Sequence, residues 1–409
     1  MGLRCTGESM MTTTEVSTTT LALNAGTPLR SADNPLPSPS PRIISPEAIK
    51  LVGRVLDSGF TLDLISEFET AVAEASGVKY GAAVANCTAA IHSVMGGLGI
   101  GPGDEVIVAP VSDYGSVAGV VMQGARAVFP DVDVLTGSIT AETIEKVITP
   151  RTRAIIAVHF YGLVCDMDPI VELARKHDII VIEDVCQAIL ADYKGRTAGG
   201  IGDIACFSFD GGKLLPTDNG GMAISNDSEI IEAIRKFAVD RGADNLPSGG
   251  REHNGIGYNY RFGDMEAGVG LAQLKILPDQ LKRRVDLAER FTAKIESIDG
   301  VMTPYIPDGC GHLYWLYNVQ FDPEQFRVDA TQMAEAMSAE GLKCMTAMYY
   351  LIPYSHTFLP DREKDLERLV NARTHLERTV RWGFTEKYTE QDLDDMAAIF
   401  TKVTDAYRR

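Results

Sequence analysis

Six short runs rich in Val and Ile recur between residues 105 and 225, and segments with helical spacing separate several of them. The runs are EVIVAP (105–110), ARAVFPDV (125–132), RAIIAVHF (153–160), DIIVIED (178–184), IACFSF (204–209) and GMAIS (221–225). Strands buried on both faces have this composition, and helices between them act as crossovers of a parallel sheet. The pattern therefore predicts an α/β fold with a mainly parallel central sheet and helices on both faces.

The rest of the chain divides around this core. Residues 1–44 are rich in Thr, Ser and Pro, which predicts a flexible tail followed by an extended arm. We expect a large domain at 45–290 and a smaller C-terminal α+β domain at 291–409. A helical stretch at 264–297 joins them, and we expect it to break near Pro278 because proline lacks the N–H that a helix interior needs.

Charge and composition exclude several classes of function. The chain has 409 residues and a formal net charge of -18, which argues against nucleic acid or anionic membranes as partners. It has no apolar stretch near the roughly 18 residues of a membrane span and no secretory signal pattern. Its seven cysteines are scattered, without a CxxC pair, so no metal site is expected. We expect a cytoplasmic enzyme.

One lysine and one aspartate stand out at the ends of predicted strands. Lys213 lies between two glycine pairs in FSFDGGKLLPTDNGG (207–221), and Asp184 ends the strand VIED. Each alone has an ordinary interpretation, a surface lysine or a helix cap. Together they indicate pyridoxal phosphate, which needs a lysine for a Schiff base and a carboxylate at its ring nitrogen. The segment NCTAA (86–90), with Thr88, opens a predicted helix whose start suits the phosphate of the cofactor. An ordinary helix N-cap has the same sequence pattern.

Longer motifs carry a family resemblance. They include EFETAVAEASGVKYGAAVANCTAAIH, VHFYGLVCDMDPI, VIEDVCQAILADYKGRTAGGIGDIACFSF and GYNYRFGDMEAGVGLAQL. The chain resembles the DegT/DnrJ/EryC1/StrS aminotransferases, which are fold-type-I enzymes dependent on pyridoxal phosphate. The resemblance covers about residues 45–300 strongly and the last hundred residues weakly.

The resemblance implies a role for individual positions. Lys213 matches the lysine that binds the cofactor covalently and shuttles a proton, and Asp184 matches the partner of the ring nitrogen. The other cofactor-binding positions that it implies are Thr88, Ala89 and Ser208 at the phosphate, Gln187 near the 3-oxygen, and Asn259, which reaches the phosphate of the neighbouring subunit. A homodimer with shared active sites follows from this role of Asn259.

Some positions depart from the family pattern. Relatives carry an aromatic residue that stacks on the cofactor where this chain has Asp113, followed by Tyr114. Either Tyr114 supplies the stack through a local shift, or the carboxylate changes the reaction, or it is a neutral replacement. The resemblance also places His159 and Tyr161 in the motif H.YG, where they shape the pocket or form a hydrogen-bonded core pair.

The resulting hypothesis is an aminotransferase that moves an amino group from glutamate or glutamine to a keto-sugar or keto-cyclitol. The resemblance places it in amino-sugar or aminocyclitol biosynthesis, including that of antibiotics. LALNAGTPLR (21–30) resembles relatives that act on free cyclitols, which slightly favours that acceptor. The alternative is a related enzyme that dehydrates, oxidises or epimerises a similar substrate. A non-catalytic protein on the same fold is disfavoured by the set of Lys213, Asp184 and Gln187.

Overall fold

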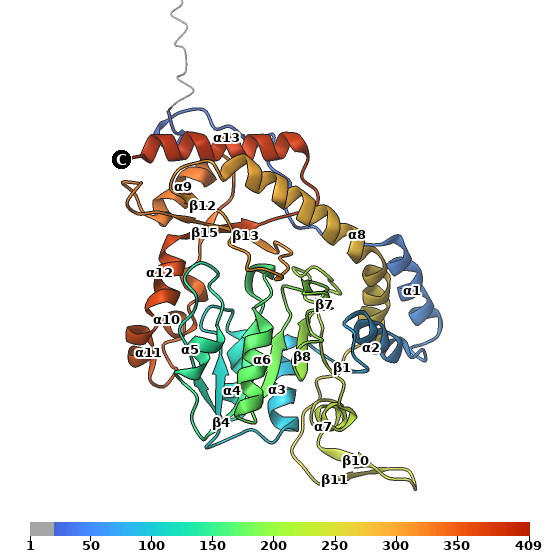
Figure 1. Ribbon diagram of the computed structural model, residues 1–409. Coiled ribbons are helices and arrows are strands. Elements are labelled where there is room, and N and C mark those ends of the chain that lie inside the picture. Colours follow the sequence, from blue (N-terminus) through green and yellow to red (C-terminus); the bar gives the residue numbers. More distant parts are fainter. Residues whose placement is uncertain (1–19) are drawn as a thin grey trace, which may run out of the picture.

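The central sheet has seven strands in the order β1-β9-β8-β5-β4-β2-β3 in the computed structural model, which describes residues 20–409 (Figure 1). The strands are β1 (Tyr80–Val84), β2 (Glu105–Val108), β3 (Arg126–Val128), β4 (Thr152–Val158), β5 (Ile180–Asp184), β8 (Ile204–Ser208) and β9 (Gly221–Ser225). Strands β8, β5, β4, β2 and β3 run parallel, and β9 is antiparallel to both of its neighbours. The predicted α/β class and mainly parallel sheet are confirmed.

Strand β1 was not predicted from the sequence. Its residues Gly81, Ala82 and Ala83 are small, so the segment lacks the Val/Ile signature of the other strands. It nevertheless pairs with β9 over its whole length, from Tyr80 opposite Ser225 to Val84 opposite Gly221. Its small side chains are buried against neighbouring elements, which is a tertiary effect that local composition does not report.

Helices cover both faces of this sheet. The connection from β2 to β3 and the connection from β4 to β5 step in opposite directions along the strand order. Because such crossovers are right-handed, α4 and α6 lie on opposite faces. Helix α3 packs against both α4 and α7, so these three helices form one layer. The thirteen α-helices of the described residues are α1 (Pro46–Asp57), α2 (Leu64–Ala75), α3 (Cys87–Gly97), α4 (Gly115–Met122), α5 (Ala141–Glu145), α6 (Met167–Lys176), α7 (Ser228–Ala238), α8 (Asp264–Ile295), α9 (Ala330–Ala339), α10 (Ile352–Ser355), α11 (Arg362–Arg368), α12 (Val370–Arg378) and α13 (Glu390–Tyr407).

A second, antiparallel sheet forms near the C-terminus and has the strand order β12-β13-β15-β14. Its inner face packs with α9 and α13 into a separate apolar core. Figure 1 shows this layer above the central sheet. The strands of this sheet and of two short hairpins are β12 (Val301–Met302), β13 (Leu316–Phe321), β14 (Met345–Thr346), β15 (Thr379–Gly383), β6 (Asp192–Tyr193), β7 (Arg196–Thr197), β10 (Ala243–Asn245) and β11 (Arg251–His253).

Helix α8 connects the two sheets and does not end at Pro278, so the expected break is wrong. Pro278 lies inside the helix, and Figure 1 shows the helix bending along its length. A proline removes one backbone hydrogen bond and kinks a helix, but packing can hold the turns on both sides. One half of α8 packs against α1 and α2, and the other half packs against α13.

The N-terminal arm lies against the C-terminal layer. Leu21 is buried in the apolar core of that layer, and Arg30 forms ion pairs of 2.5 Å with Asp392 and 2.6 Å with Asp395. The flexible tail and arm were predicted together at residues 1–44, and residues 1–19 of this segment lie outside the described residues. The domain limits at 44/45 and 290/291 stay a prediction.

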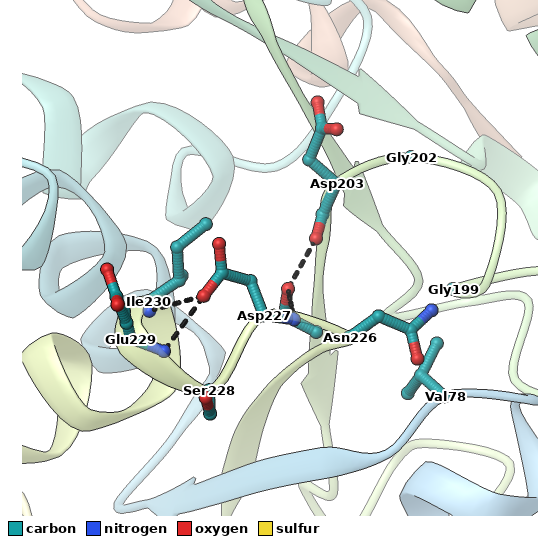
Figure 2. Close-up of a pocket in the computed structure, with 10 residues that line it drawn as sticks. Val78, Gly199, Gly202, Asp203, Asn226, Asp227, Ser228, Glu229 and Ile230 are labelled. Atoms are coloured by element: carbon teal, nitrogen blue, oxygen red, sulfur yellow. Dashed lines mark hydrogen bonds between the residues drawn. The ribbon is translucent and has the colours of Figure 1, made fainter.

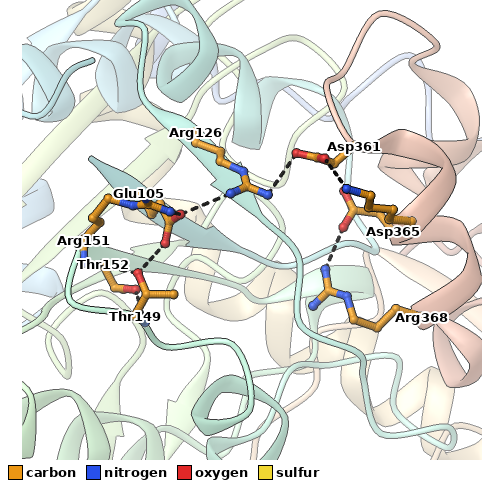
Figure 3. A network of polar contacts seen from close by, with 9 residues as sticks. Glu105, Arg126, Thr149, Arg151, Thr152, Asp361, Asp365 and Arg368 are labelled. Carbon is orange, nitrogen blue, oxygen red and sulfur yellow. Dashed lines mark hydrogen bonds and ion pairs between the residues drawn. The ribbon is translucent and has the colours of Figure 1, made fainter. Parts of the chain in front are cut away.

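Residues from the C-terminal third also pack on the large core. Leu351, Ile352 and Leu376 belong to the same apolar cluster as the central sheet. A polar network fixes this contact at the edge of the sheet, where Arg126 bridges buried Glu105 at 3.3 Å and Asp361 at 2.9 Å (Figure 3). The C-terminal segment is thereby held beside the strands that carry the site.

Candidate active site

A cavity of about 370 Å³ opens at the carboxyl ends of β2, β4, β5 and β8. Ligands of open α/β sheets bind at this edge, because the loops that follow parallel strands converge there. The cavity brings together residues that lie far apart in the sequence. Six of the residues that line it were singled out from the sequence: Thr88, Asp113, Asp184, Gln187, Ser208 and Lys213.

Asp184 is held at the end of β5 by two hydrogen bonds. Ser116 Oγ donates to Asp184 Oδ2 at 2.6 Å, and the Cys186 N–H donates to Oδ1 at 3.1 Å. The side chain is buried, with 3% of the residue exposed. Among the described residues, no basic side chain forms an ion pair with this buried carboxylate. It can therefore stabilise a cationic group of a ligand, such as a protonated pyridine nitrogen.

Lys213 follows β8 in a tight turn. Its N–H donates to the Asp210 carbonyl at 2.8 Å, and its Nζ lies 4.5 Å from the centre of the Trp315 ring. The Trp315 Nε1–H donates to the Gly212 carbonyl at 3.0 Å, so the indole also fixes the backbone of this turn. Of the described residues that line the cavity, only Lys213 is basic. The glycine pair before Lys213 keeps side chains out of the space that its amine must reach.

The motif H.YG contacts Gln187 through a backbone N–H, and its two side chains do not form the hydrogen-bonded pair that was one of the two alternatives. The Tyr161 N–H donates to Gln187 Oε1 at 2.7 Å, which orients a residue of the cavity lining. His159 Nε2–H donates to Glu183 Oε2 at 3.0 Å, and both side chains are fully buried. His159 and Tyr161 are thus core residues, but no hydrogen bond between their side chains joins them.

The start of α3 supplies the polar group expected for a phosphate. Thr88 lines the cavity, whereas Ala89 does not. The Ala89 N–H donates to Asn86 Oδ1 at 2.9 Å, so Asn86 is the N-cap of this helix. The N-cap interpretation holds for Asn86, whereas the phosphate-binding roles of Thr88 and Ala89 stay predictions. Ser208 contributes a hydroxyl from the end of β8.

Two other predicted site residues lie outside the cavity. The Tyr114 ring stacks on His356 with ring centres 4.5 Å apart, so a local shift that brings it into the lining is absent here. Asp113 occupies the lining instead, and its Oδ1 accepts a hydrogen bond from the Gly115 N–H at 3.0 Å. Asn259 is exposed on the loop before α8. The cofactor-binding roles of Tyr114 and Asn259 stay predictions.

The sequence analysis did not find four further residues at or beside the site. Ser116 and Trp315 contact Asp184 and Lys213, respectively, but a serine and a tryptophan have too many ordinary uses to stand out in one sequence. Cys87 and Cys186 lie with Asp184 in the cavity, with potential ligand atoms within 4.8 Å of one another. A hydrogen bond with Cys186 lowers the pKa of the Cys87 thiol, but burial raises it, and the result is a pKa of about 12. The thiol is therefore protonated near neutral pH.

A larger and more open hollow lies at the opposite edge of the sheet, where β8 begins and β9 ends (Figure 2). Its polar groups serve the chain's own turns. Asp227 Oδ1 accepts the N–H groups of Glu229 and Ile230, and Ser225 Oγ donates to the Asp203 carbonyl at 2.7 Å. Strand polarity places this hollow away from Lys213, so it is not the catalytic site.

The sequence of the chain matches the DegT/DnrJ/EryC1/StrS aminotransferase family over residues 42–401. The chain belongs to this family. It is 34% identical to the spore coat polysaccharide biosynthesis protein SpsC of Bacillus subtilis, covering 87% of this chain and 93% of that protein. It is 36% identical to the GDP-perosamine synthase of Caulobacter vibrioides, covering 73% and 80%. An aminotransferase structure from Psychrobacter cryohalolentis has a TM-score of 0.80 at 31% identity, covering 91% and 99%.

The enzyme is therefore a pyridoxal phosphate-dependent aminotransferase. The residues of the cavity fit this cofactor. A lysine amine, a buried carboxylate and two hydroxyl groups, from Lys213, Asp184, Thr88 and Ser208, line one space of suitable size. The family and the cofactor expected from the sequence are confirmed. No helix among residues 20–409 combines the length and apolar character needed to cross a membrane.

Proposed function

We propose that the enzyme transfers an amino group from glutamate or glutamine to a ketone on a sugar or cyclitol ring, for amino-sugar or aminocyclitol biosynthesis. The observation that carries the proposal is the convergence of Lys213 and Asp184 in one cavity at the carboxyl edge of the sheet. The names of the relatives support a carbohydrate acceptor, since one makes GDP-perosamine and another serves spore coat polysaccharide synthesis.

The chain's own residues divide the work of the reaction. When bound, the cofactor supplies an electron sink that stabilises negative charge on the substrate carbon. Asp184 keeps a proton on the ring nitrogen of the cofactor, because its carboxylate favours a cationic partner. Lys213 Nζ moves a proton to and from the substrate carbon, as a general base and then a general acid. Gln187, whose Oε1 accepts a hydrogen bond from the Tyr161 N–H, would hold the cofactor near its 3-oxygen.

The charged residues of the cavity indicate whether the acceptor is an anion or an uncharged molecule. Asp113, Asp184 and Asp210 line it together with a single basic residue, Lys213. Once Asp184 faces the cofactor, the other two carboxylates disfavour a second anionic group nearby. This arrangement supports an uncharged ring, such as a free keto-cyclitol or keto-sugar. The relatives' names support a nucleotide-linked sugar, whose diphosphate would then have to bind outside the cavity.

We also propose a homodimer with shared active sites. Asn259, which the family resemblance directs toward the neighbouring subunit's phosphate, is exposed and lies outside the cavity of its own chain. Large apolar side chains near it are exposed as well, with Ile256 at 84% and Tyr258 at 39%. Exposed apolar groups of this size are typical of a surface that another chain covers.

The test has two stages. Borohydride reduction of the purified enzyme should fix the cofactor covalently to Lys213, as peptide mass spectrometry will show. The enzyme is then incubated with glutamate or glutamine and a panel of free keto-cyclitols, keto-sugars and nucleotide-linked keto-sugars, with product mass as the readout. A gain of an amino group on one class identifies the acceptor. Conversion of no panel member, with the cofactor correctly attached, would overturn the carbohydrate acceptor.

A further inference from the structure

Two cysteine thiols and the carboxylate of Asp184 meet in the cavity at the carboxyl edge of the sheet. The Sγ atoms of Cys87 and Cys186 and a carboxylate oxygen of Asp184 all lie within 4.8 Å of one another, and the three residues line the cavity. Cys87 and Asp184 are buried, and Cys186 is half-buried. Thiolates and carboxylates are among the side chains that bind transition metals. Within residues 20–409, no second set of three such groups lies this close together.

The fold brings these side chains together from two separate elements. Asp184 ends β5, and Cys186 follows it in a turn where the Cys186 N–H donates to Asp184 Oδ1 at 3.1 Å. Cys87 is the first residue of α3, which follows β1. The residue before it, Asn86, pairs through its backbone with Gly220, just before β9. The cluster is a tertiary feature, so scattered cysteines without a CxxC pair give no sign of it in the sequence.

All three groups are available to a metal ion. The two cysteines are free thiols, and a hydrogen bond links them to each other. Asp184 is 3% exposed, and in the part of the chain that the structure describes its carboxylate accepts only from Ser116 Oγ and the Cys186 N–H. A buried carboxylate of this kind is stabilised by a cation that binds it directly.

The donor set selects a zinc-type ion. A tetrahedral zinc ion binds thiolates at about 2.3 Å and carboxylate oxygens at about 2.0–2.2 Å, so its neighbouring ligand atoms lie about 3.5–4 Å apart. The three atoms already lie near this spacing, and rotation about the Cα–Cβ bonds of the cysteines can close the difference. Calcium and magnesium need about six or more oxygen ligands, and the cluster supplies a single carboxylate. The cavity of about 370 Å³ has room for water as a fourth ligand.

We propose that the cofactor-free enzyme binds one zinc ion through Cys87, Asp184 and Cys186, and that zinc and pyridoxal phosphate exclude each other. Zinc binding breaks two S–H bonds and forms two zinc–sulfur bonds, and both protons pass to the solvent without any transfer of electrons. Asp184 is the proposed partner of the protonated ring nitrogen of the cofactor, and a zinc ion at the same carboxylate repels that cation. The exclusion rests on this proposed role of Asp184, whereas the zinc site itself does not.

The first experiment titrates zinc alone into the cofactor-free enzyme by calorimetry. One zinc ion should bind per chain with release of about two protons, measured in buffers of different ionisation enthalpy. Cys87→Ser and Cys186→Ser should each weaken binding at least about 100-fold, because even a hydrogen-bond partner of a metal ligand contributes about 10- to 100-fold. Cys344→Ala is the matched control and should bind zinc like wild type, since Cys344 is 8% exposed, as Cys87 is, but lies in the C-terminal core.

Two measurements separate ligand loss from misfolding. Circular dichroism shows whether each variant is folded. Titration of wild type with cadmium, which binds thiolates as zinc does, should produce thiolate-to-metal absorbance in the ultraviolet without any substitution. Wild type that binds no zinc, or zinc binding that is equally tight in both serine variants, would overturn the site.

The second experiment adds pyridoxal phosphate to the zinc-bound enzyme in the presence of a coloured chelator too weak to remove the zinc unaided. Saturating cofactor should release the zinc. Zinc should in turn slow covalent attachment of the cofactor at Lys213, and EDTA should restore the rate. Zinc that stays bound under saturating cofactor would disprove the exclusion. Neither titration uses an amino donor or an acceptor, so an error in the proposed function would not change these results.

Discussion

Ser116 Oγ donates a 2.6 Å hydrogen bond to Asp184 Oδ2 and so joins two separate strand–helix connections of the central sheet. Asp184 ends β5, whereas Ser116 lies in the first turn of α4, which follows β2. Ser112 Oγ lies 2.7 Å from Ser116 Oγ, so a second hydroxyl group is hydrogen-bonded to the one that contacts Asp184. The carboxylate that faces the cofactor is thus oriented by an element other than its own.

Ser116→Ala should weaken cofactor binding about tenfold, since a hydrogen bond to a charged carboxylate is lost. Equilibrium dialysis or absorbance titration of the cofactor-free enzyme measures the dissociation constant. Ser112→Ala is the matched control, because its hydroxyl contacts Ser116 and not Asp184, and it should have a smaller effect. Equal affinities for wild type and Ser116→Ala would show that Cys186 N–H alone positions the carboxylate.

Lys213→Ala should abolish turnover and borohydride trapping while the enzyme stays folded. The side chain is half-buried at the cavity and contributes little apolar area to the core, so the melting temperature should stay near that of wild type. Asp184→Asn should lower kcat by several orders of magnitude, because a neutral ring nitrogen weakens the electron sink. Near-normal turnover of either variant would contradict the assigned roles.

The sequence predicted the parts of this architecture that local patterns report. The Val/Ile runs located six strands of the central sheet, and the motifs around Lys213 and Asp184 located the cavity. β1 was missed because Gly81, Ala82 and Ala83 lack a strand signature, and the strand is fixed by pairing with β9. The break at Pro278 was wrong for the same kind of reason, since tertiary packing carries α8 through a residue that local propensity disfavours.

The site shows the same division between local and tertiary information. Asp184 and Lys213 were found because one ends a predicted strand and the other follows one. Trp315 reaches Lys213 from beyond the central sheet, about a hundred positions along the chain, and no local pattern encodes that contact.

Glu105 should stabilise the edge of the central sheet. Its buried carboxylate accepts hydrogen bonds of 2.5 Å from Thr149 Oγ1 and from Arg151, and it also contacts Arg126 (Figure 3). Glu105→Gln should lower the free energy of unfolding by about 1–3 kcal/mol, because charged partners lose their acceptor. Urea denaturation at pH 7 measures this. Glu142→Gln, at an exposed carboxylate paired with Lys146, should have no measurable effect.

The carboxylate of Glu105 should also make the free energy of unfolding depend on pH in the acidic range. Burial raises the pKa of Glu105, but the hydrogen bonds from Thr149 and Arg151 outweigh burial and lower the pKa below its ordinary value. A carboxylate with a lowered folded-state pKa stabilises the protein above its unfolded pKa, and this contribution is lost as the pH falls through the folded pKa. The difference between wild type and Glu105→Gln should therefore shrink in acid. A difference that stays constant to below pH 3 would contradict this account.

Two buried histidines should add a separate acid sensitivity at higher pH. Burial lowers the pKa of His312 to about 3 and that of His375 to about 4, the latter against a hydrogen bond with the Val134 carbonyl. Their unfolded pKa is about 6.5, so the unfolded chain binds more protons as the pH falls below that value. Stability should decrease from pH 6.5 toward pH 4, by at most about 1.4 kcal/mol per pH unit for each histidine. Urea denaturation across this range should show that the free energy of unfolding falls less steeply with pH for His312→Leu than for wild type.

His177→Gln, at an exposed position on the end of α6, is the control and should keep the wild-type pH slope. A His312→Leu slope equal to that of wild type would mean that His312 is not neutral in the folded protein.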